Sequence, residues 1–396
     1  MQRHGNIVKT EDKKPRAESL HPHALCAMQK IMKILFVNNF RGRGGGEEFL
    51  RDLLPGLVKK GVKVGLVCRP NTPLADMFPR TGVEVYSVRR SGKGAFTSVF
   101  KIAKIIKNGG YEIVSIQRGH DIIQSWVASL LSFRNPVLIY TVQVPEFLRS
   151  RFLLRKMDRI TTISRYIAEK IASFYPALAQ RTSILYYGID LGKFKRETIP
   201  SGWFRNRIGL SPQTKVIATV GDLWKNQIEF LDALAEIRQT FPDVKYALVA
   251  SETGIGQIEE FKGRASKLGL TDAVLWTGRL TKDEMLSFYA DVDIAVSTHR
   301  NEGFGIWVLE SLAMGRPVIA FNEGGIRDSL DGCPAGVLVD GGPREMAVAL
   351  LRILQDDTLL KRMSEAGPRW TEKKFSRERM VEDYFLFFES ISTQRK

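Results

Sequence analysis

Short, continuous apolar segments alternate with amphipathic helical patterns along most of this chain of 396 residues. In its first half the strand-like and helical segments lie at 33–37, 48–60, 62–68, 83–88, 96–108, 113–116 and 137–141. Strands that are apolar on both faces and are separated by helices are typical of a parallel sheet covered on both sides. The alternation therefore predicts an α/β fold built on a doubly wound parallel sheet.

The same alternation restarts after residue 200. Its segments lie at 216–220, 227–240, 246–250, 274–276, 294–296, 304–314, 318–320 and 343–355. With 44% hydrophobic residues, a chain of this length can bury two cores. We expect two Rossmann-like domains that face a central cleft, over 32–190 and 191–375. A C-terminal helix over 376–396 should pack back on the first domain, and 1–31 should be a disordered extension.

The excess positive charge of the chain lies in its first half. The net charge is +16; residues 1–190 hold 31 Lys and Arg against 14 Asp and Glu, whereas residues 191–396 hold 28 against 29. This asymmetry favours an anionic partner for the first half: nucleic acid, a membrane or an acidic substrate. Three scattered cysteines form no metal knuckle, and no apolar segment resembles a membrane span or a signal peptide core. We expect a cytoplasmic protein.

Glycines crowd the loop after the first predicted strand. Gly44, Gly45 and Gly46 precede Glu47, but Glu47 occupies the third glycine position of a G-x-G-x-x-G fingerprint, and no G-K-[ST] motif follows any glycine loop. Glycines let backbone amides approach an anion at a helix N-terminus. We expect an anion or substrate site here, with a plain strand-to-helix turn as the alternative.

The segment 297–310 is the most specific in the chain. It follows a predicted strand, places Glu302 in a loop and carries Glu310 into the next helix. A phosphate at this helix N-terminus would meet the free amides near Phe304 and Gly305, and the two carboxylates could accept hydrogen bonds from hydroxyl groups on either side of it. That layout suits a nucleotide sugar. Alternatively, Glu302 complements the helix dipole and Glu310 is a solvated helix residue.

Several sequence motifs occur in the order in which one enzyme family has them. The segment from Glu302 to Glu310, followed by Gly315-Arg316-Pro317 and Gly324-Gly325, resembles the E-x7-E signature of the retaining family 4 glycosyltransferases. The segments 44–47, 184–194, 336–339 and 375–387 resemble other parts of that family, so the resemblance covers nearly the whole chain from Met32. It implies the type B fold, in which the first Rossmann-like domain binds the acceptor and the second binds a nucleotide sugar.

The resemblance also implies roles for individual residues. Glu302 matches the carboxylate that holds the donor sugar, Glu310 the one that binds the ribose, and Lys225 the lysine that neutralises the diphosphate. The donor side further includes Gly44, Gly45, Gly46, Arg279, Phe304, Gly305 and Ile306. No metal or other cofactor is implied, because cationic side chains and helix amides can stabilise the leaving group.

Two positions depart from the family pattern. Asp222 stands where the family has the arginine that partners the lysine, and an anion there would repel a diphosphate unless it faced away or bound a hydroxyl group. Gln117 stands where the family often has a histidine near the acceptor. His120, three residues later, is assigned to the acceptor side, with an ordinary polar loop residue as the alternative.

A basic and aromatic segment over 145–159 predicts where the first domain meets its anionic partner. If the segment is helical, Arg151, Arg155 and Arg159 fall on one face, and Arg149 and Lys156 enlarge the patch. Lys101, Lys104 and Lys107 form a similar stripe. Such patches suit an anionic membrane surface or an acidic acceptor, with a solvated helix face as the alternative.

The family resemblance implies a retaining glycosyltransferase. It would move a sugar from a nucleotide sugar to a hydroxyl of a glycolipid, saccharide or polysaccharide precursor of the lipopolysaccharide type, at the inner membrane face. We expect front-face attack, with Glu302 positioning the donor, Lys225 stabilising the leaving group and His120 beside the acceptor. A non-catalytic glycosyltransferase-like subunit is the main alternative. A nicotinamide-dependent oxidoreductase lacks its fingerprint, and no nucleic-acid recognition motif accompanies the charge.

Overall fold

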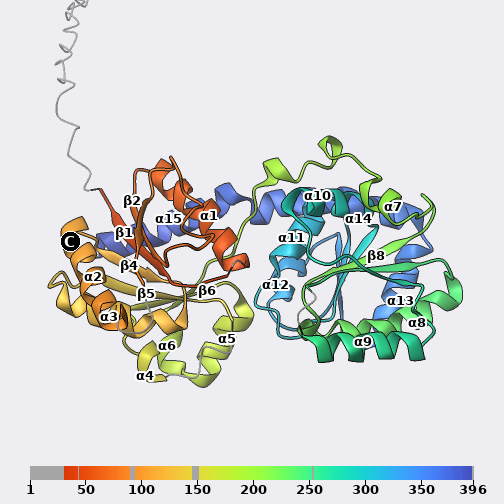
Figure 1. Ribbon diagram of the computed structural model, residues 1–396, viewed down its shortest axis with the longest axis horizontal. Helices are drawn as coiled ribbons and strands as arrows, with labels where there is room; N and C mark the ends of the chain where they lie inside the picture. Colours follow the sequence, from red (N-terminus) through yellow and green to blue (C-terminus); the bar gives the residue numbers. More distant parts are fainter. Residues whose placement is uncertain (1–30, 43, 90–93, 145–150, 252–253, 395–396) are drawn as a thin grey trace, which may run out of the picture. The chain divides into compact units, whose positions relative to one another are not determined.

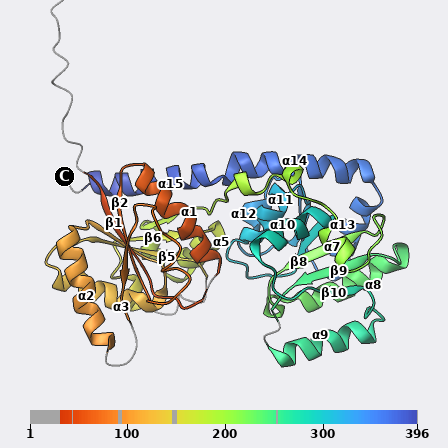
Figure 2. The same cartoon turned by 45° about the horizontal axis from the view of Figure 1, so that its top comes forward.

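The computed structural model describes residues 31–42, 44–89, 94–144, 151–251 and 254–394 (Figure 1). The disordered extension was predicted over 1–31, and residues 1–30 lie outside the described part of the chain. Residues 32–396 group together by their contacts and contain two parallel sheets, which Figure 2 shows from a second angle. This confirms the prediction of two doubly wound α/β domains.

The first sheet has seven strands in the order β3-β2-β1-β4-β5-β6-β7. They are β1 (Lys33–Asn38), β2 (Lys63–Cys68), β3 (Glu84–Ser87), β4 (Ile113–Ile116), β5 (Val137–Val142), β6 (Arg159–Thr162) and β7 (Thr182–Ile184). Its helices are α1 (Gly45–Lys59), α2 (Gly94–Gly109), α3 (Ile122–Leu131), α4 (Arg151–Leu154), α5 (Arg165–Phe174) and α6 (Pro176–Ala179). Strand β1 pairs with both β2 and β4, so the strand order reverses between β1 and β4.

The second sheet has six strands in the order β10-β9-β8-β11-β12-β13. They are β8 (Val216–Val220), β9 (Lys245–Val249), β10 (Val274–Trp276), β11 (Ile294–Ser297), β12 (Val318–Phe321) and β13 (Gly336–Val339). The helices are α7 (Trp203–Arg207), α8 (Phe230–Thr240), α9 (Ile255–Lys267), α10 (Lys282–Asp291), α11 (Ile306–Ala313), α12 (Ile326–Leu330) and α13 (Pro343–Leu354). Here the order reverses between β8 and β11, and ligands of doubly wound folds bind at such reversals.

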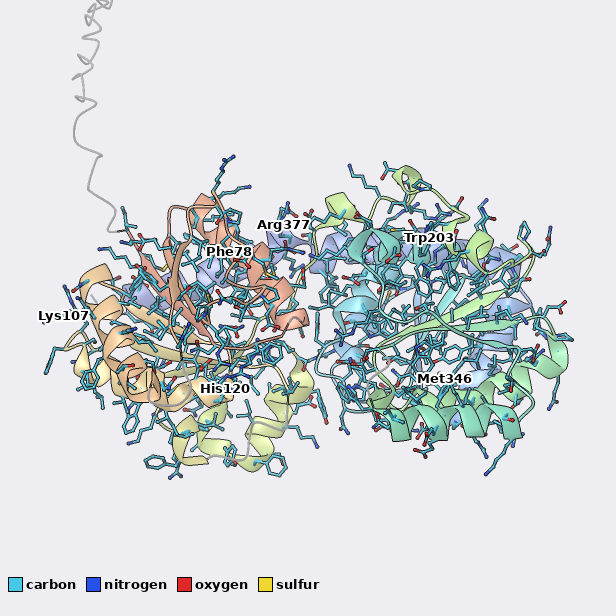
Figure 3. The ribbon with its side chains drawn as sticks, in the orientation of Figure 1. Phe78, Lys107, His120, Trp203, Met346 and Arg377 are labelled. Atoms are coloured by element: carbon cyan, nitrogen blue, oxygen red, sulfur yellow. The ribbon has the colours of Figure 1, made fainter. Side chains whose placement is uncertain are left out.

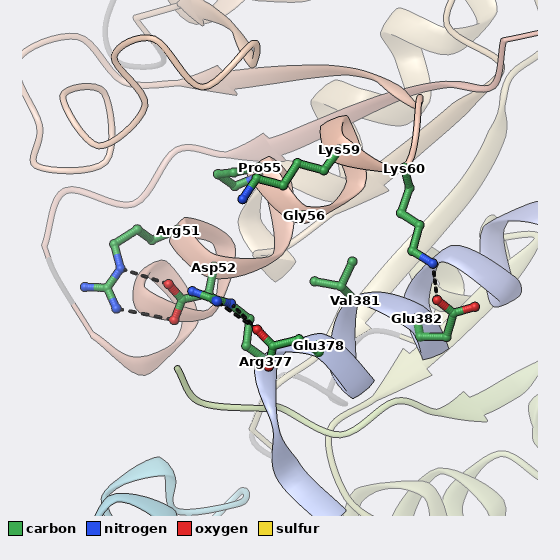
Figure 4. Close-up of a pocket in the computed structure, with 10 residues that line it drawn as sticks. All are labelled: Arg51, Asp52, Pro55, Gly56, Lys59, Lys60, Arg377, Glu378, Val381 and Glu382. Atoms are coloured by element: carbon green, nitrogen blue, oxygen red, sulfur yellow. Dashed lines mark hydrogen bonds and ion pairs between the residues drawn. The ribbon is translucent and has the colours of Figure 1, made fainter. Parts of the chain in front are cut away.

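Two consecutive helices end the described chain. Helix α14 (Asp357–Phe375) packs on α11 and α13, and Ser376 caps α15 (Arg377–Thr393) by accepting a hydrogen bond from the Arg379 amide. Helix α15 packs against α1, where Val381 lies beside Gly56 (Figure 4). A Cβ at Gly56 would collide with Val381, so glycine permits this close contact.

Candidate active site

A cavity of about 780 Å³ opens at the end of β8. Its walls come from α1, from the segment after β7, and from α10 and α11, and they include Gly44, Glu48, Val220, Tyr289, Ile306 and Glu310. The salt bridge between Lys282 and Glu48, 2.8 Å long, joins two of the lining residues. The cavity therefore lies at the strand-order reversal of the second sheet, where a ligand is expected.

The loop between β11 and α11 follows a path that requires glycine. Gly305, directly before α11, has a φ of 83°, which residues with a side chain rarely adopt. A Cβ at Gly303 would collide with the carbonyl oxygen of Gln143, and a Cβ at Gly325 would collide with the carbonyl of Gly303. The Gly325 amide donates to the Glu302 carbonyl at 2.6 Å. These contacts fix the backbone that presents the Glu302 side chain.

The Glu302 carboxylate is held from three sides. Its Oε2 lies 2.7 Å from Nζ of Lys225 and 3.3 Å from Nδ1 of His299, and its Oε1 accepts the Gly303 amide at 3.2 Å. Burial alone would raise the pKa of Glu302, which is 9% exposed, but Lys225 and His299 outweigh burial and lower the pKa to about 2. Glu302 is therefore an ionised and positioned carboxylate at neutral pH.

The loop that carries Lys225 is tied to the same region. Asn226 adopts a left-handed conformation with φ of 68°, and its carbonyl accepts the Thr298 hydroxyl at 2.9 Å. Gln227 closes the loop by donating to the Gly221 carbonyl at 2.9 Å. Lys225 is thereby placed beside Glu302 by hydrogen bonds as well as by charge.

Glu310 has a different environment from Glu302. It lines the cavity, and its Oε2 accepts the Tyr289 hydroxyl at 3.0 Å. Burial raises the pKa of Glu310 to about 7, against the opposing effect of the Tyr289 hydrogen bond. The two carboxylates of the signature therefore differ in charge near neutral pH: Glu302 is ionised and Glu310 is poised to titrate.

The three predicted glycines after β1 differ in their surroundings. Gly44 lines the cavity, whereas a Cβ at Gly45 would lie 3.0 Å from Cδ1 of Ile306 and a Cβ at Gly46 would collide with the Gln143 amide. Gly45 and Gly46 therefore lie against neighbouring side chains, and of the three glycines Gly44 is the one that lines the cavity.

Both departures from the family pattern are bound to neighbouring side chains. Asp222 Oδ1 accepts the Ser251 amide at 2.9 Å and also the Ser251 hydroxyl. Gln117 is buried and donates to Ser115 Oγ at 2.9 Å and to Thr141 Oγ1 at 3.3 Å. Asp222 thus binds a hydroxyl group, and Gln117 joins a polar network within the first sheet.

His120 lies at the strand-order reversal of the first sheet, and Figure 3 labels it. Its Nε2 is 3.6 Å from Oδ1 of Asp121, whose Oδ2 accepts the Asn39 amide at 3.0 Å. Nearby, Arg118 pairs with the buried Glu47 at 2.5 Å. Polar residues after β1 and β4 therefore gather in this domain too.

Two further residues assigned to the donor side occupy other environments. The Phe304 ring is buried and stacks on Tyr186 with centroids 5.8 Å apart, and the Phe304 carbonyl accepts the Ser329 hydroxyl at 3.3 Å. Arg279 is exposed and directly precedes Leu280, which lines the cavity.

The condition for a shared arginine face, a helix that runs from Arg151 to Arg159, is not met. Helix α4 ends at Leu154, and Arg159 begins β6, where it pairs with Ile139 of β5 and donates to Gln394 at 3.1 Å. The sheet register overrides the helical charge spacing, so the arginines share no helix face. Arg155 and Lys156 are exposed; Arg149 and the Arg151 side chain lie outside the described residues.

Two site residues were missed from the sequence. His299 contacts Glu302 from three positions earlier, and Tyr289 reaches Glu310 from α10. The short spacing of His299 was a usable signal, whereas nothing local marked Tyr289. Within the described ranges no group of three or more His, Cys, Asp or Glu side chains could hold a metal ion, and no helix is long and apolar enough to span a membrane.

Comparison with known proteins gives two family matches. The family model described as "Glycosyl transferases group 1" matches residues 204–370, and "Glycosyltransferase Family 4" matches residues 43–193. A D-inositol 3-phosphate glycosyltransferase of Corynebacterium jeikeium is 32% identical over 194 residues, which cover 47% of this chain and 46% of that protein. The chain thus matches this relative over about half of the relative's length.

Solved structures support the fold. A glycosyltransferase from Rickettsia africae has a TM-score of 0.78 at 17% identity, covering 91% of this chain and 99% of its own. The Anabaena protein HepE, solved in complex with UDP and glucose, has a TM-score of 0.75 at 20% identity, covering 91% and 100%. The family resemblance expected from the motifs is confirmed: the chain belongs to the group 1 glycosyltransferases, with an amino-terminal domain of the Family 4 type.

Proposed function

We propose that this chain is a retaining glycosyltransferase that uses a nucleotide sugar as donor. One observation carries the proposal: the ionised Glu302, paired with Lys225, stands before the N-terminus of α11, while Glu310 of the same helix lines the adjacent cavity. Two carboxylates on either side of a helix N-terminus suit a sugar and a ribose joined by a diphosphate. The complex of HepE with UDP and glucose supports this class of donor.

In the proposed reaction Glu302 positions the donor sugar through its hydroxyl groups. Lys225 turns from Glu302 toward the diphosphate as the bond to the sugar breaks, so that positive charge meets the departing oxygens. The acceptor hydroxyl attacks from the side of the leaving phosphate, which accepts its proton, and the anomeric configuration is retained. His120 lies on the acceptor side, and no metal or cofactor takes part.

The acceptor we propose is a hydroxyl group of a cell-envelope glycolipid or polysaccharide precursor, reached from the cytoplasmic membrane face. Two observations support it: the excess positive charge of residues 1–190 and the phosphorylated acceptor in the name of the Corynebacterium relative. Both favour a substrate that carries negative charge.

A thermal-shift screen of nucleotide sugars, beginning with UDP-glucose, tests the donor. A ligand at 100 times its dissociation constant should stabilise the protein by about 2.7 kcal/mol. Glu302→Ala should then abolish transfer while leaving the far-ultraviolet circular dichroism unchanged. Transfer at the wild-type rate by this variant would remove Glu302 from the mechanism.

The second candidate, a non-catalytic glycosyltransferase-like subunit, rests on Asp222 and Gln117. The hydrogen bonds from Ser251 to Asp222 favour the enzyme, because they engage the carboxylate with protein donors. Donor binding without hydrolysis or transfer to any acceptor in a lipid and saccharide panel would favour the subunit instead.

A further inference from the structure

Large apolar side chains are exposed along one part of the first domain. They come from α2, from α3 and the turn after it, and from α4: Phe100, Ile123, Leu130, Leu131, Phe133 and Phe152. Helices α2 and α3 pack against each other, and all three helices flank the first sheet in Figure 1. We call these residues, with Trp126, the α2–α4 apolar surface. Exposed apolar groups in such numbers mark an interaction site.

Helix α3 provides the centre of this surface. Ile123, Trp126 and Leu130 are spaced by three and four residues, so they share one face of the helix. Ile123 and Leu130 are each 53% exposed, and the Trp126 ring meets the Phe152 ring of α4 edge-on with centroids 6.5 Å apart. The apolar face of α3 thus extends across to α4.

The turn after α3 holds Phe133 in an unfavourable backbone conformation. Its φ is 56°, a conformation that bulky residues rarely adopt, and its side chain is 83% exposed. The turn is held by Ser132, whose hydroxyl donates to the Ser129 carbonyl at 2.7 Å. Strain combined with exposure of a large aromatic ring gains nothing for the fold and points to a role outside it.

The charged residues of the segments that form this surface are all positive, and the acidic residues that flank these segments are Asp121, which is buried, and Asp158, which is exposed. The segments 94–109, 122–134 and 151–157 contain no Asp or Glu. Lys101, Lys104 and Lys107 are exposed along α2, and Figure 3 shows Lys107 pointing outward. The Lys156 ammonium lies 5.1 Å from the ring centroids of both Trp126 and Phe152. Cations therefore border the apolar side chains.

We propose that the α2–α4 apolar surface docks this protein on an anionic phospholipid bilayer. Ile123, Leu130 and Phe133 would enter the boundary between headgroups and acyl chains, and the lysines of α2 would lie over anionic headgroups. The inference rests on the proposed function, because a glycolipid acceptor resides in such a bilayer. It places the membrane contact on a surface centred on α3 instead of on the basic segment 145–159.

Charge complementarity favours a bilayer over a second copy of the chain. A twofold dimer would place the same surface of each copy face to face, and the six Lys and Arg side chains described as exposed in the three segments would oppose six like charges. An anionic bilayer instead offers opposite charge over its whole area, together with an apolar interior.

Flotation of the full chain with lipid vesicles tests the proposal. The chain should float with phosphatidylcholine–phosphatidylglycerol vesicles and not with phosphatidylcholine alone. The triple variant Ile123→Ser, Leu130→Ser, Phe133→Ser should lower partitioning about tenfold or more. The triple variant Lys101→Glu, Lys104→Glu, Lys107→Glu should lower it about a hundredfold or more, since loss of each lysine costs about fivefold and each glutamate adds repulsion.

Matched substitutions at exposed positions elsewhere serve as controls. Two triple variants should leave partitioning unchanged. The apolar control combines Ile255→Ser, Val348→Ser and Leu386→Ser, and the charge control combines Lys262→Glu, Lys267→Glu and Lys361→Glu. Equal flotation of the wild type and the apolar variant would overturn the proposal. A wild-type protein that is dimeric in solution and becomes monomeric in the apolar variant would overturn it too. The UDP-glucose thermal shift of each variant checks folding and donor binding separately, so failure of docking is distinguishable from failure of the glycosyltransferase proposal.

Discussion

Nζ of Lys225 lies 2.7 Å from Oε2 of Glu302, although 77 residues separate the two in the chain. Lys225 comes from the loop after β8 and Glu302 from the loop after β11, and these strands are neighbours at the reversal of strand order. The pair therefore joins the two loops on which the proposed chemistry depends.

Removing Lys225 should cost both stability and activity. Lys225→Met leaves the buried Glu302 carboxylate without its ammonium partner, and we expect a loss of about 1–3 kcal/mol in the free energy of unfolding. The double variant Lys225→Met, Glu302→Gln should recover part of that loss but no transfer activity. Denaturant unfolding and a donor transfer assay measure the two effects; full additivity of the single changes would contradict a direct coupling.

Glu302 should make the protein sensitive to acid. Its pKa is lowered to about 2 in the folded state, so its stabilising effect is fully present above its ordinary pKa of 4.5 and is lost as the pH falls toward 2. Above pH 5 we expect Glu302→Gln to be less stable than the wild type by on the order of 2 kcal/mol, with the difference vanishing at low pH. A difference that persists unchanged through this range would exclude the ion pair as its source.

Glu310 should make nucleotide binding depend on pH near neutrality, whereas the effect of Glu302 lies in the acidic range. Because its pKa is raised to about 7, Glu310 becomes ionised as the pH rises through neutrality, and a carboxylate accepts hydrogen bonds from ribose hydroxyls better than a carboxylic acid does. UDP affinity, measured by calorimetry, should increase from pH 6 to pH 8 in the wild type and stay flat in Glu310→Gln. An equal rise in both proteins would assign the titration to another group.

The loop glycines should tolerate no side chain. Gly325→Ala would force a Cβ against the Gly303 carbonyl and Ser164, and we expect a loss of about 2 kcal/mol or more in unfolding free energy. Gly263→Ala is the matched control, because nothing lies within 4 Å of a Cβ there and α9 should gain about 0.5–1 kcal/mol. Thermal unfolding separates the two; equal stability of Gly325→Ala and the wild type would mean that the loop can shift.

Local patterns were sufficient to predict the architecture. Apolar runs such as Ile34–Val37 and Val216–Val220 form central strands of the two sheets, because a segment apolar on both faces can be buried only inside a layered fold. The family motifs likewise predicted Glu302, Glu310 and Lys225. Long helix α14 and the short strands β6 and β7 were not predicted, since their patterns are weak.

The sequence by itself determined the fold class, the family and the residues to examine. Only the tertiary structure decided what those residues contact: Glu302 with Lys225, Asp222 with Ser251, and Glu310 with Tyr289. It also decided that Arg159 belongs to a strand and that the exposed apolar face is on α3. The physical reason is that hydrophobic periodicity is local, whereas pairing, burial and pKa depend on which distant loops the sheet order brings together.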